Sequence, residues 1–291
     1  MEKDKAYKYE IDAPGLNLER TLFCGQAFRW SPCGKNSFFG TVNQGAVVAK
    51  TQNNSLLLTC SQEDLEFWKH YFDLAKDYGE AEKMLLNDPK TAPSVEYSSG
   101  IRVLNQDPFE TMISFIISAN NNVKRISSTI ERLSKRYGTH KSLEDREYFT
   151  FPSAKSLANA SEVDLKECGV GYRAPYIISS AAKIANGYDF EAVRKLDYET
   201  AKKELMTFSG IGPKVADCIL LFSLGFGEAF PVDVWVKRVL VELFDCTQKD
   251  SDVRAVVKRY GKWAGAAQQY LFHYARQVGL GTKKQEKSIN S

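Results

Sequence analysis

The sequence contains few side chains that bind metals. Of its 291 residues six are cysteines and three are histidines, and no two cysteines form a Cys-x-x-Cys pair. Structural zinc sites and iron–sulfur clusters use about four grouped Cys or His ligands, so the sequence excludes both kinds of centre. We therefore expect no bound metal, and we interpret most of the cysteines as reduced thiols.

Long apolar runs are also missing. The longest stretches, such as residues 219–224, are far shorter than the roughly 20 residues that a membrane helix needs. The first residues lack the apolar segment of a secretory signal peptide. The sequence thus predicts no membrane partner and an intracellular location, cytoplasmic in a bacterium and nuclear in a eukaryote.

An excess of one charge is absent as well. Lys and Arg total 39 against 36 for Asp and Glu, which gives a net charge of +3. The composition, 43% hydrophobic and 26% charged, is that of an ordinary soluble globular protein. Such a weak basic bias permits a nucleic-acid partner but does not indicate one.

Two kinds of pattern divide the chain. Residues 37–41, 46–51 and 56–60 are separated by Asn- and Gly-containing turns, which is typical of consecutive antiparallel hairpins. After about residue 100 the patterns are almost wholly helical. We expect an α+β, mostly α protein: an N-terminal antiparallel sheet domain with short helices at 1–100, then a helical body at 101–291. The later helices are predicted at 174–186, 198–208, 213–224, 234–244, 251–260 and 263–278.

A helix–hairpin–helix is predicted at residues 198–225. Gly210 and Gly212 allow a tight turn and a close approach of the backbone to another surface. Pro213 suits the first position of the second helix. The free N–H groups there can hold a DNA phosphate. An ordinary antiparallel pair of helices remains an alternative interpretation.

Two further residues carry possible chemistry. Lys214 falls in the first turn of the predicted second helix, where the positive end of the helix dipole disfavours an ammonium group and favours a nucleophilic amine. Asp233 precedes another predicted helix, so it could cap that helix or stabilise positive charge on a sugar as a glycosidic bond breaks. A solvated lysine at a helix end is the competing interpretation of Lys214.

At this point the chain resembles the 8-oxoguanine DNA glycosylases of the helix–hairpin–helix glycosylase superfamily. The matching motifs occur in the family's order at residues 25–30 (GQAFRW), 120–125 (NNNVKR), 171–173 (GYR), 210–218 (GIGPKVADC), 231–233 (PVD) and 264–272 (AGAAQQYLF). The resemblance implies a bifunctional glycosylase and AP lyase that flips 8-oxoguanine, preferably opposite cytosine, out of double-stranded DNA. It also implies a monomer that needs no cofactor, with room for a monovalent cation at the hairpin.

The resemblance assigns catalytic and base-binding roles to single residues. Lys214 would attack the sugar C1′ and form a Schiff base that allows β-elimination, and Asp233 would assist charge stabilisation and proton transfer. The Gly25 carbonyl would accept a hydrogen bond from the N7–H that distinguishes 8-oxoguanine from guanine. Cys218 and Phe272 would sandwich the flipped base.

Gln268 would read the Watson–Crick edge of that base. Taken alone, Cys218 and Phe272 are more typical of core residues, and Gln268 of a solvated surface. Phe272 follows Gln268 by four residues, as Cys218 follows Lys214, so each pair would share one helical face.

The resemblance further implies contacts with the cytosine left without its partner, made by Asn120, Arg125 and Arg173, with Tyr172 as a wedge beside it. Their simpler interpretations are a helix cap for Asn120, surface charges for the arginines and a half-buried Tyr172. Trp235 departs from the family, whose vertebrate members usually carry a histidine there near the lesion's phosphates. We therefore transfer no phosphate contact to Trp235.

Three other classes of DNA-binding protein share part of this pattern. Alkylpurine glycosylases lack the lysine that this chain has at position 214. Many adenine and pyrimidine glycosylases carry a C-terminal four-cysteine cluster, which this chain lacks. A non-catalytic DNA-binding protein could use the hairpin as a phosphate clamp, but such a clamp needs neither Lys214 nor Asp233.

Overall fold

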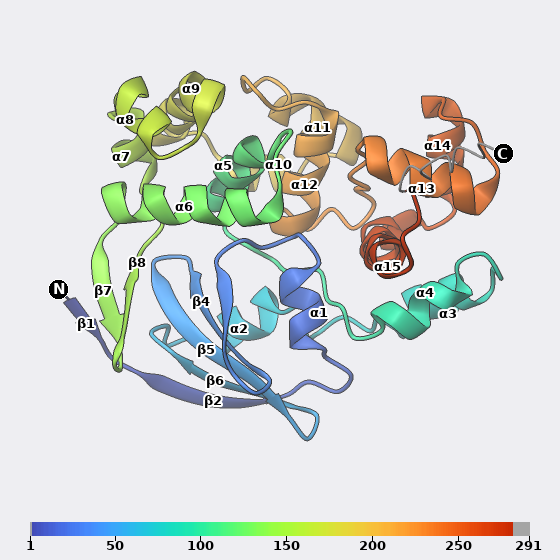
Figure 1. The fold of residues 1–291 in the computed structure, drawn as a ribbon, viewed down its shortest axis with the longest axis horizontal. Coiled ribbons are helices and arrows are strands. Elements are labelled where there is room, and N and C mark those ends of the chain that lie inside the picture. Colours follow the sequence, from blue (N-terminus) through green and yellow to red (C-terminus); the bar gives the residue numbers. More distant parts are fainter. Residues whose placement is uncertain (1, 282–291) are drawn as a thin grey trace, which may run out of the picture.

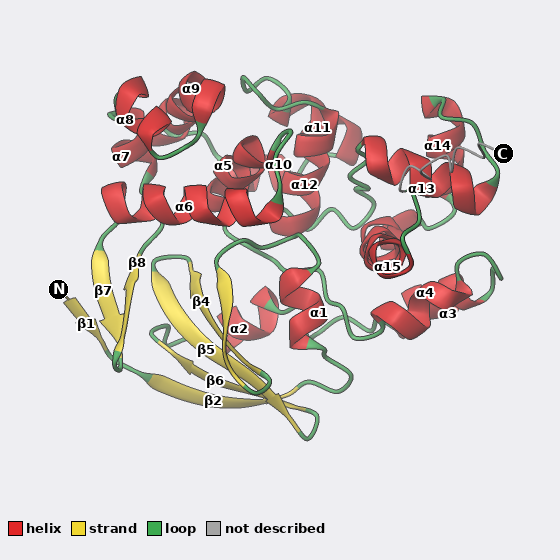
Figure 2. Ribbon diagram, in the orientation of Figure 1, coloured by secondary structure: helices red, strands yellow, loops and turns green. Residues whose placement is uncertain are grey.

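The structure, a computed structural model, describes residues 2–281, so residues 282–291 of the predicted helical body lie outside the described part. A curved antiparallel sheet lies below a body of helices (Figures 1 and 2). The sheet has the order β2-β6-β5-β4-β3. Its strands are β2 (Tyr7–Asp12), β3 (Trp30–Gly34), β4 (Ser37–Val42), β5 (Gly45–Gln52) and β6 (Ser55–Cys60). The predicted α+β, mostly α class is confirmed.

The three predicted strands form β4, β5 and β6 in consecutive hairpins. Asn43 and Asn53 adopt positive φ in the two connecting turns, a conformation that Asn tolerates better than most residues. One helix, α1 (Leu18–Phe23), precedes the three predicted strands. It packs its buried Leu18 and Leu22 against the sheet core.

Helices make up most of the remaining chain. The six predicted helices correspond to α9 (Ala174–Ala185), α11 (Tyr198–Leu205), α12 (Pro213–Ser223), α13 (Val234–Phe244), α14 (Asp250–Lys258) and α15 (Ala264–Val278). They confirm the predicted helices to within a few residues. The short α10 (Phe190–Arg194) lies between α9 and α11. The earlier helices are α2 (Leu65–Tyr71), α3 (Gly79–Leu86), α4 (Ala92–Ser98), α5 (Pro108–Ser118), α6 (Val123–Tyr137), α7 (Ala154–Ala158) and α8 (Glu162–Glu167).

A second, three-stranded sheet contradicts the almost wholly helical prediction after residue 100. β7 (His140–Leu143) and β8 (Arg146–Phe149) form a short hairpin, and β1 (Glu2–Asp4) pairs with β7 in parallel (Figure 1). The turn between β7 and β8 lacks the Asn-Gly pair that is typical of tight hairpins. Glu144 adopts the positive φ in this turn. Four-residue strands that depend on a partner from the other end of the sequence leave little local pattern.

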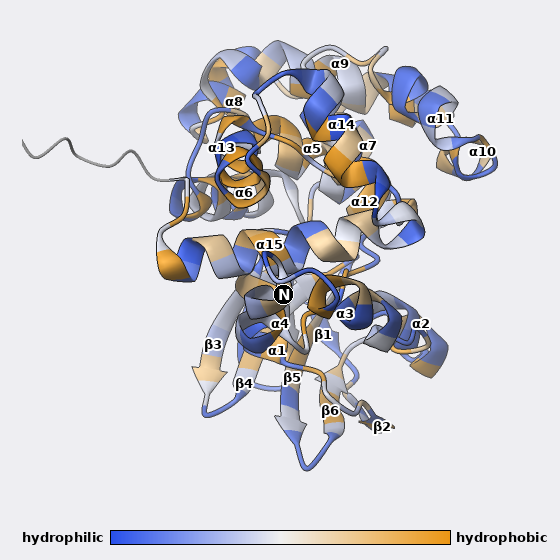
Figure 3. Ribbon diagram, turned by 90° about the vertical axis from the view of Figure 1, so that its right-hand side faces the viewer, coloured by the Kyte–Doolittle hydropathy of each residue, from blue (hydrophilic) through white to orange (hydrophobic). Residues whose placement is uncertain are grey.

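The centre of the helical body is formed by α5 and α12. Phe115 of α5 stacks on Phe222 of α12 with ring centroids 5.5 Å apart. In Figure 3, α5 is mostly hydrophobic, whereas α11 at the periphery is mostly hydrophilic. Within residues 2–281, no helix combines the length and the apolar character needed to cross a membrane.

A buried ion pair joins the sheet domain to α5. The Arg29 guanidinium lies 3.6 Å from the Glu110 carboxylate, and the two side chains are only 9% and 17% exposed. Arg29 also donates to the Phe149 carbonyl of β8. Burial raises the pKa of Glu110 to about 7, and the charge of Arg29 opposes that rise. The pair therefore contacts three elements that are distant in the sequence.

Removing one member of this pair should cost more stability than removing both. Glu110→Ala leaves the Arg29 charge buried without its partner, which we expect to lower the free energy of unfolding by about 3–5 kcal/mol. An Arg29→Met/Glu110→Leu double variant should lose much less, because no charge remains to be desolvated. Urea unfolding of the three proteins checks this, and a double variant weaker than Glu110→Ala would contradict it.

Candidate active site

The predicted hairpin is present, and its two glycines have different structural roles. Gly210 has a φ of +81°, and a Cβ there would lie 2.6 Å from the Tyr176 ring. Gly212 caps α12 with a φ of −91°, and a Cβ there would meet nothing within 4 Å. The fold therefore requires glycine at 210, while at 212 glycine leaves an exposed helix start open to approach from outside.

A buried carboxylate fixes the two helices of the hairpin to each other. Asp217 of α12 is 4% exposed. It accepts hydrogen bonds from the Tyr198 hydroxyl at 2.7 Å and the Lys202 ammonium at 2.8 Å, both on α11. Burial raises the pKa of Asp217, and Lys202 opposes that rise. Sequence reasoning assigned no role to Asp217, although it lies within the GIGPKVADC motif.

The start of α12 opens into a cavity of about 60 Å³. Lys214, the second residue of α12, is half-buried, and its Nζ lies 5.3 Å from the centroid of the Phe115 ring. The cavity brings together the predicted catalytic and base-binding residues and several neighbours. They are Cys24, Gly25, Phe115, Lys214, Cys218, Phe222, Pro231, Asp233, Val236, Gln268, Gln269 and Phe272.

Asp233 serves as a helix cap and lines the cavity at the same time. Its side chain accepts a hydrogen bond from the Val236 N–H at 2.8 Å, which satisfies one free donor at the start of α13. This bond fixes the carboxylate beside the cavity that Lys214 also lines. The two interpretations of Asp233 are therefore compatible.

Cys218 and Gly25 form part of the cavity wall. Cys218 is 2% exposed, and burial raises the pKa of its thiol to about 12, so the side chain is neutral near pH 7. Gly25 has a φ of +102°, and a Cβ there would lie 3.8 Å from a carbon of the Phe272 ring. The backbone conformation explains the glycine, and it places the main chain next to that ring.

Phe272 is held from two sides. Its ring packs edge to face with Trp235 at a centroid distance of 4.9 Å, and the Arg276 guanidinium lies 5.4 Å from its centroid. Trp235, to which we transferred no phosphate contact, therefore makes an aromatic contact with a residue of the cavity wall.

Six lining residues had no predicted role: Cys24, Phe115, Phe222, Pro231, Val236 and Gln269. Phe115 lies in the mostly apolar α5, and no sequence signal distinguishes it from its buried neighbours. Gln269 could have been found, because two consecutive amides, Gln268 and Gln269, are unusual in the otherwise apolar run at 264–272.

The residues expected to contact the unpaired cytosine lie on two neighbouring segments. Asn120, with a φ of +51°, and Arg125 are exposed on and after the α5–α6 loop, and Tyr172 is 59% exposed. Arg173 is only 8% exposed and donates to the carbonyls of Val170 and Ala119.

These placements contradict the simpler interpretations of Arg173, Asn120 and Tyr172. Arg173 is not a surface charge, because its side chain ties the Gly171–Arg173 turn to the α5–α6 loop. Asn120 is not the cap of α6, since Asn122 accepts the capping bond from the Arg125 N–H. Tyr172 is more exposed than a half-buried residue, and its ring lies 4.4 Å from the Arg173 guanidinium.

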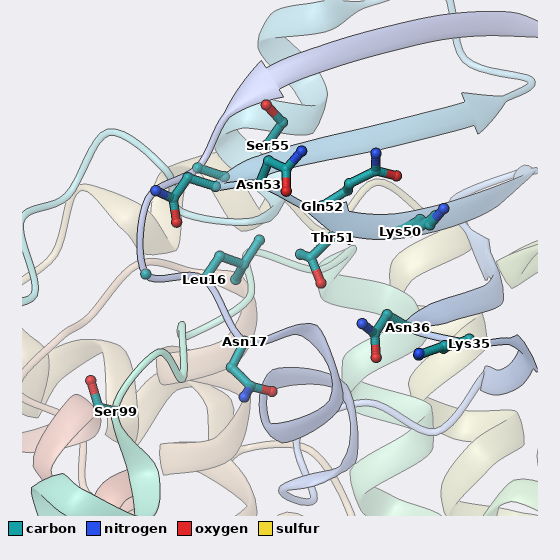
Figure 4. Close-up of a pocket in the computed structure, with 13 residues that line it drawn as sticks. Leu16, Asn17, Lys35, Asn36, Lys50, Thr51, Gln52, Asn53, Ser55 and Ser99 are labelled. Carbon is teal, nitrogen blue, oxygen red and sulfur yellow. The ribbon is translucent and has the colours of Figure 1, made fainter.

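A larger cavity of about 580 Å³ lies at the end of the sheet domain (Figure 4). It is lined by amides, hydroxyls and two lysines, Lys35 and Lys50, and by no carboxylate, thiol or imidazole. None of the predicted site residues lines it. The cavity of about 60 Å³ at the start of α12 is the candidate active site, because the predicted catalytic and base-binding residues line it together.

Comparison with known families matches nearly the whole chain. The 8-oxoguanine DNA glycosylase N-terminal domain matches residues 8–112. The HhH-GPD superfamily of base excision DNA repair proteins matches residues 113–265.

Individual relatives agree with the family matches. The chain is 36% identical to a probable N-glycosylase/DNA lyase of Methanothermobacter thermautotrophicus, over 73% of this chain and 75% of the relative. It is 32% identical to the N-glycosylase/DNA lyase OGG1 of Arabidopsis thaliana, over 92% and 80%. A solved structure of Clostridium acetobutylicum 8-oxoguanine glycosylase/lyase with DNA containing cytosine opposite 8-oxoguanine has a TM-score of 0.87 and 34% identity, over 96% and 100%.

The two hairpin glycines should differ in their tolerance of alanine. Gly210→Ala introduces a positive-φ penalty and a clash with Tyr176, so we expect it to lower the free energy of unfolding by about 2 kcal/mol or more. Gly212→Ala should cost less than about 1 kcal/mol, because only the preference for glycine over alanine at a helix cap is lost. Urea unfolding measures both, and equal losses would contradict the different roles of the two positions.

Proposed function

The chain belongs to the HhH-GPD superfamily of base excision DNA repair proteins and carries an 8-oxoguanine DNA glycosylase N-terminal domain, and on this basis we propose that Lys214 is its catalytic nucleophile. The enzyme is a DNA glycosylase with AP lyase activity, and it excises 8-oxoguanine in base excision repair. One observation carries the assignment to Lys214: its amine shares a cavity with Asp233, Gln268 and Phe272.

The proposed reaction begins with attack of the unprotonated Lys214 amine on the sugar C1′. The new N–C1′ bond forms as the bond from C1′ to the base breaks, and the base leaves with the electron pair. Departure of the ring oxygen from C1′ then gives a Schiff base. Loss of a proton from C2′ expels the 3′ phosphate and cleaves the strand by β-elimination.

Asp233 supports the first step electrostatically. Positive charge develops on the sugar as the glycosidic bond breaks, and a fixed carboxylate near that charge lowers the energy of the transition state. The hydrogen bond from the Val236 N–H keeps this carboxylate in place. In this proposal Asp233 also accepts and returns the protons that move during the reaction.

Recognition of the base would use the remaining cavity wall. The flipped base stacks between the neutral Cys218 thiol and the Phe272 ring, and Gln268 reads its Watson–Crick edge. The Gly25 carbonyl accepts from N7–H, a donor that guanine lacks. An acceptor left unpaired beside guanine would cost about 1–3 kcal/mol, which is enough to discriminate between the two bases.

Binding of the duplex would use the exposed segments around the cavity. The open backbone at Gly212 lets a phosphate reach the first N–H groups of α12, next to the Gly210 turn. Asn120, Arg125 and Tyr172 then face the cytosine, with preference for that base, and Arg173 either reaches it or positions Tyr172. The substrate is double-stranded DNA, and the enzyme acts as a monomer.

No cofactor is needed in this mechanism, because Lys214 supplies the nucleophile. A monovalent cation at the hairpin would help to hold the backbone near the phosphate. Within residues 2–281, no group of three or more His, Cys, Asp or Glu side chains could hold a metal ion.

Borohydride trapping tests the nucleophile. With a duplex containing 8-oxoguanine opposite cytosine, the wild-type protein should form a covalent adduct, and Lys214→Gln should form none. Lys8→Gln removes the same charge from an exposed position on strand β2 and should trap like the wild type. If the wild type formed no adduct and released no base, Lys214 would not be a nucleophile in this enzyme.

Gly25→Ala tests lesion recognition. Its backbone conformation is strained for alanine, so the carbonyl should shift and the excision of 8-oxoguanine should slow by about tenfold. Affinity for undamaged duplex, measured by fluorescence anisotropy, should stay near the wild-type value. Equal losses on damaged and undamaged DNA would contradict the role of the Gly25 carbonyl.

A further inference from the structure

Two consecutive amide side chains lie in the wall of the cavity. Gln268 and Gln269 of α15 are 5% and 3% exposed, and both line the cavity of Lys214. The Gln269 amide nitrogen donates to the Gln268 side-chain oxygen at 2.5 Å. Gln269 therefore orients the amide of Gln268 and shares its environment.

One atom of this pair is left without a partner. The Gln269 Oε1 is buried and accepts no hydrogen bond from any residue that the structure describes. Burial of an unpaired amide oxygen costs free energy, and such atoms in native proteins need an explanation. Here the atom belongs to a residue that lines the cavity, so a bound ligand can supply the missing donor.

The chemistry of the pair indicates which ligand edge fits. Gln268 Oε1 keeps a second lone pair after accepting from Gln269, so the pair offers two neighbouring carbonyl oxygens. Guanine-type bases carry two adjacent donors on the Watson–Crick edge, N1–H and the exocyclic 2-amino group. A base without the 2-amino group would leave one of these oxygens buried and unpaired.

We propose that Gln269 is a second specificity-determining residue, whose Oε1 accepts a hydrogen bond from the 2-amino group of the flipped base while Gln268 reads N1–H. This inference rests on the proposed excision of 8-oxoguanine in this cavity. It adds a selection for 2-amino purines to the selection for the oxidised ring, which depends on Gly25.

The test compares two lesions that differ only in that amino group. Single-turnover excision is measured on duplexes with 8-oxoguanine or 8-oxohypoxanthine opposite cytosine. The wild type should excise 8-oxoguanine about 5- to 10-fold faster, the size of one net hydrogen bond. Gln269→Met should lose this preference by slowing 8-oxoguanine excision by that factor and leaving 8-oxohypoxanthine excision unchanged. Gln277→Met, an exposed position on the same helix, should behave like the wild type.

The other outcomes contradict either the role of Gln269 or the proposed function itself. A Gln269→Met variant that slows both lesions equally assigns Gln269 a structural role only and overturns the inference, as does a wild type without preference. Gln269→Ala gives the same readout if the methionine variant does not fold, as judged by thermal melting. If the wild type excises neither lesion, the proposed function fails as well, and trapping through Lys214 distinguishes that case.

Discussion

The contact of Asp217 with Tyr198 and Lys202 is the interaction on which the site depends most. It joins α11 to α12 through a buried carboxylate, so the hairpin turn and the first turn of α12 form one rigid unit. That turn carries an open helix start on its outer side and the Lys214 amine on the cavity side. A phosphate bound at the helix start would therefore bring the sugar of its own strand toward the amine without any adjustment of the backbone.

Apart from Lys214 and Asp233, the cavity would recognise the flipped base through uncharged hydrogen-bonding groups and stacking surfaces. The Cys218 thiol is neutral and the two glutamine amides carry no charge. Phe272 packs against the Trp235 ring and the Arg276 guanidinium. Among the residues that line the cavity, Lys214 and Asp233 are those with a basic or acidic side chain. This separation suits an enzyme that must distinguish two purines by single donors and acceptors, because a buried unpaired polar atom penalises the wrong base.

Much of this arrangement could be predicted from the sequence, and the exceptions have physical causes. The later helices were predictable because caps and apolar periodicity are local signals. The site residues that line the cavity were assigned instead through ordered motifs that resemble a known family. The β7–β8 hairpin was missed because it depends on β1, more than 100 residues away in the sequence. The burial of Arg173 was missed because its carbonyl partners, Val170 and Ala119, give no side-chain signal. The two consecutive amides are visible in the sequence, but the role of Gln269 needed the structure, since only the structure reveals an acceptor without a donor.

The central claim is that one particular amine attacks the sugar. The most direct measurement is mass spectrometry of the borohydride-reduced protein–DNA adduct after proteolysis, which locates the residue that carries the sugar remnant. Our account predicts a single modified site at Lys214. A remnant on Lys202, another lysine of the hairpin, or on the N-terminal amine would contradict it.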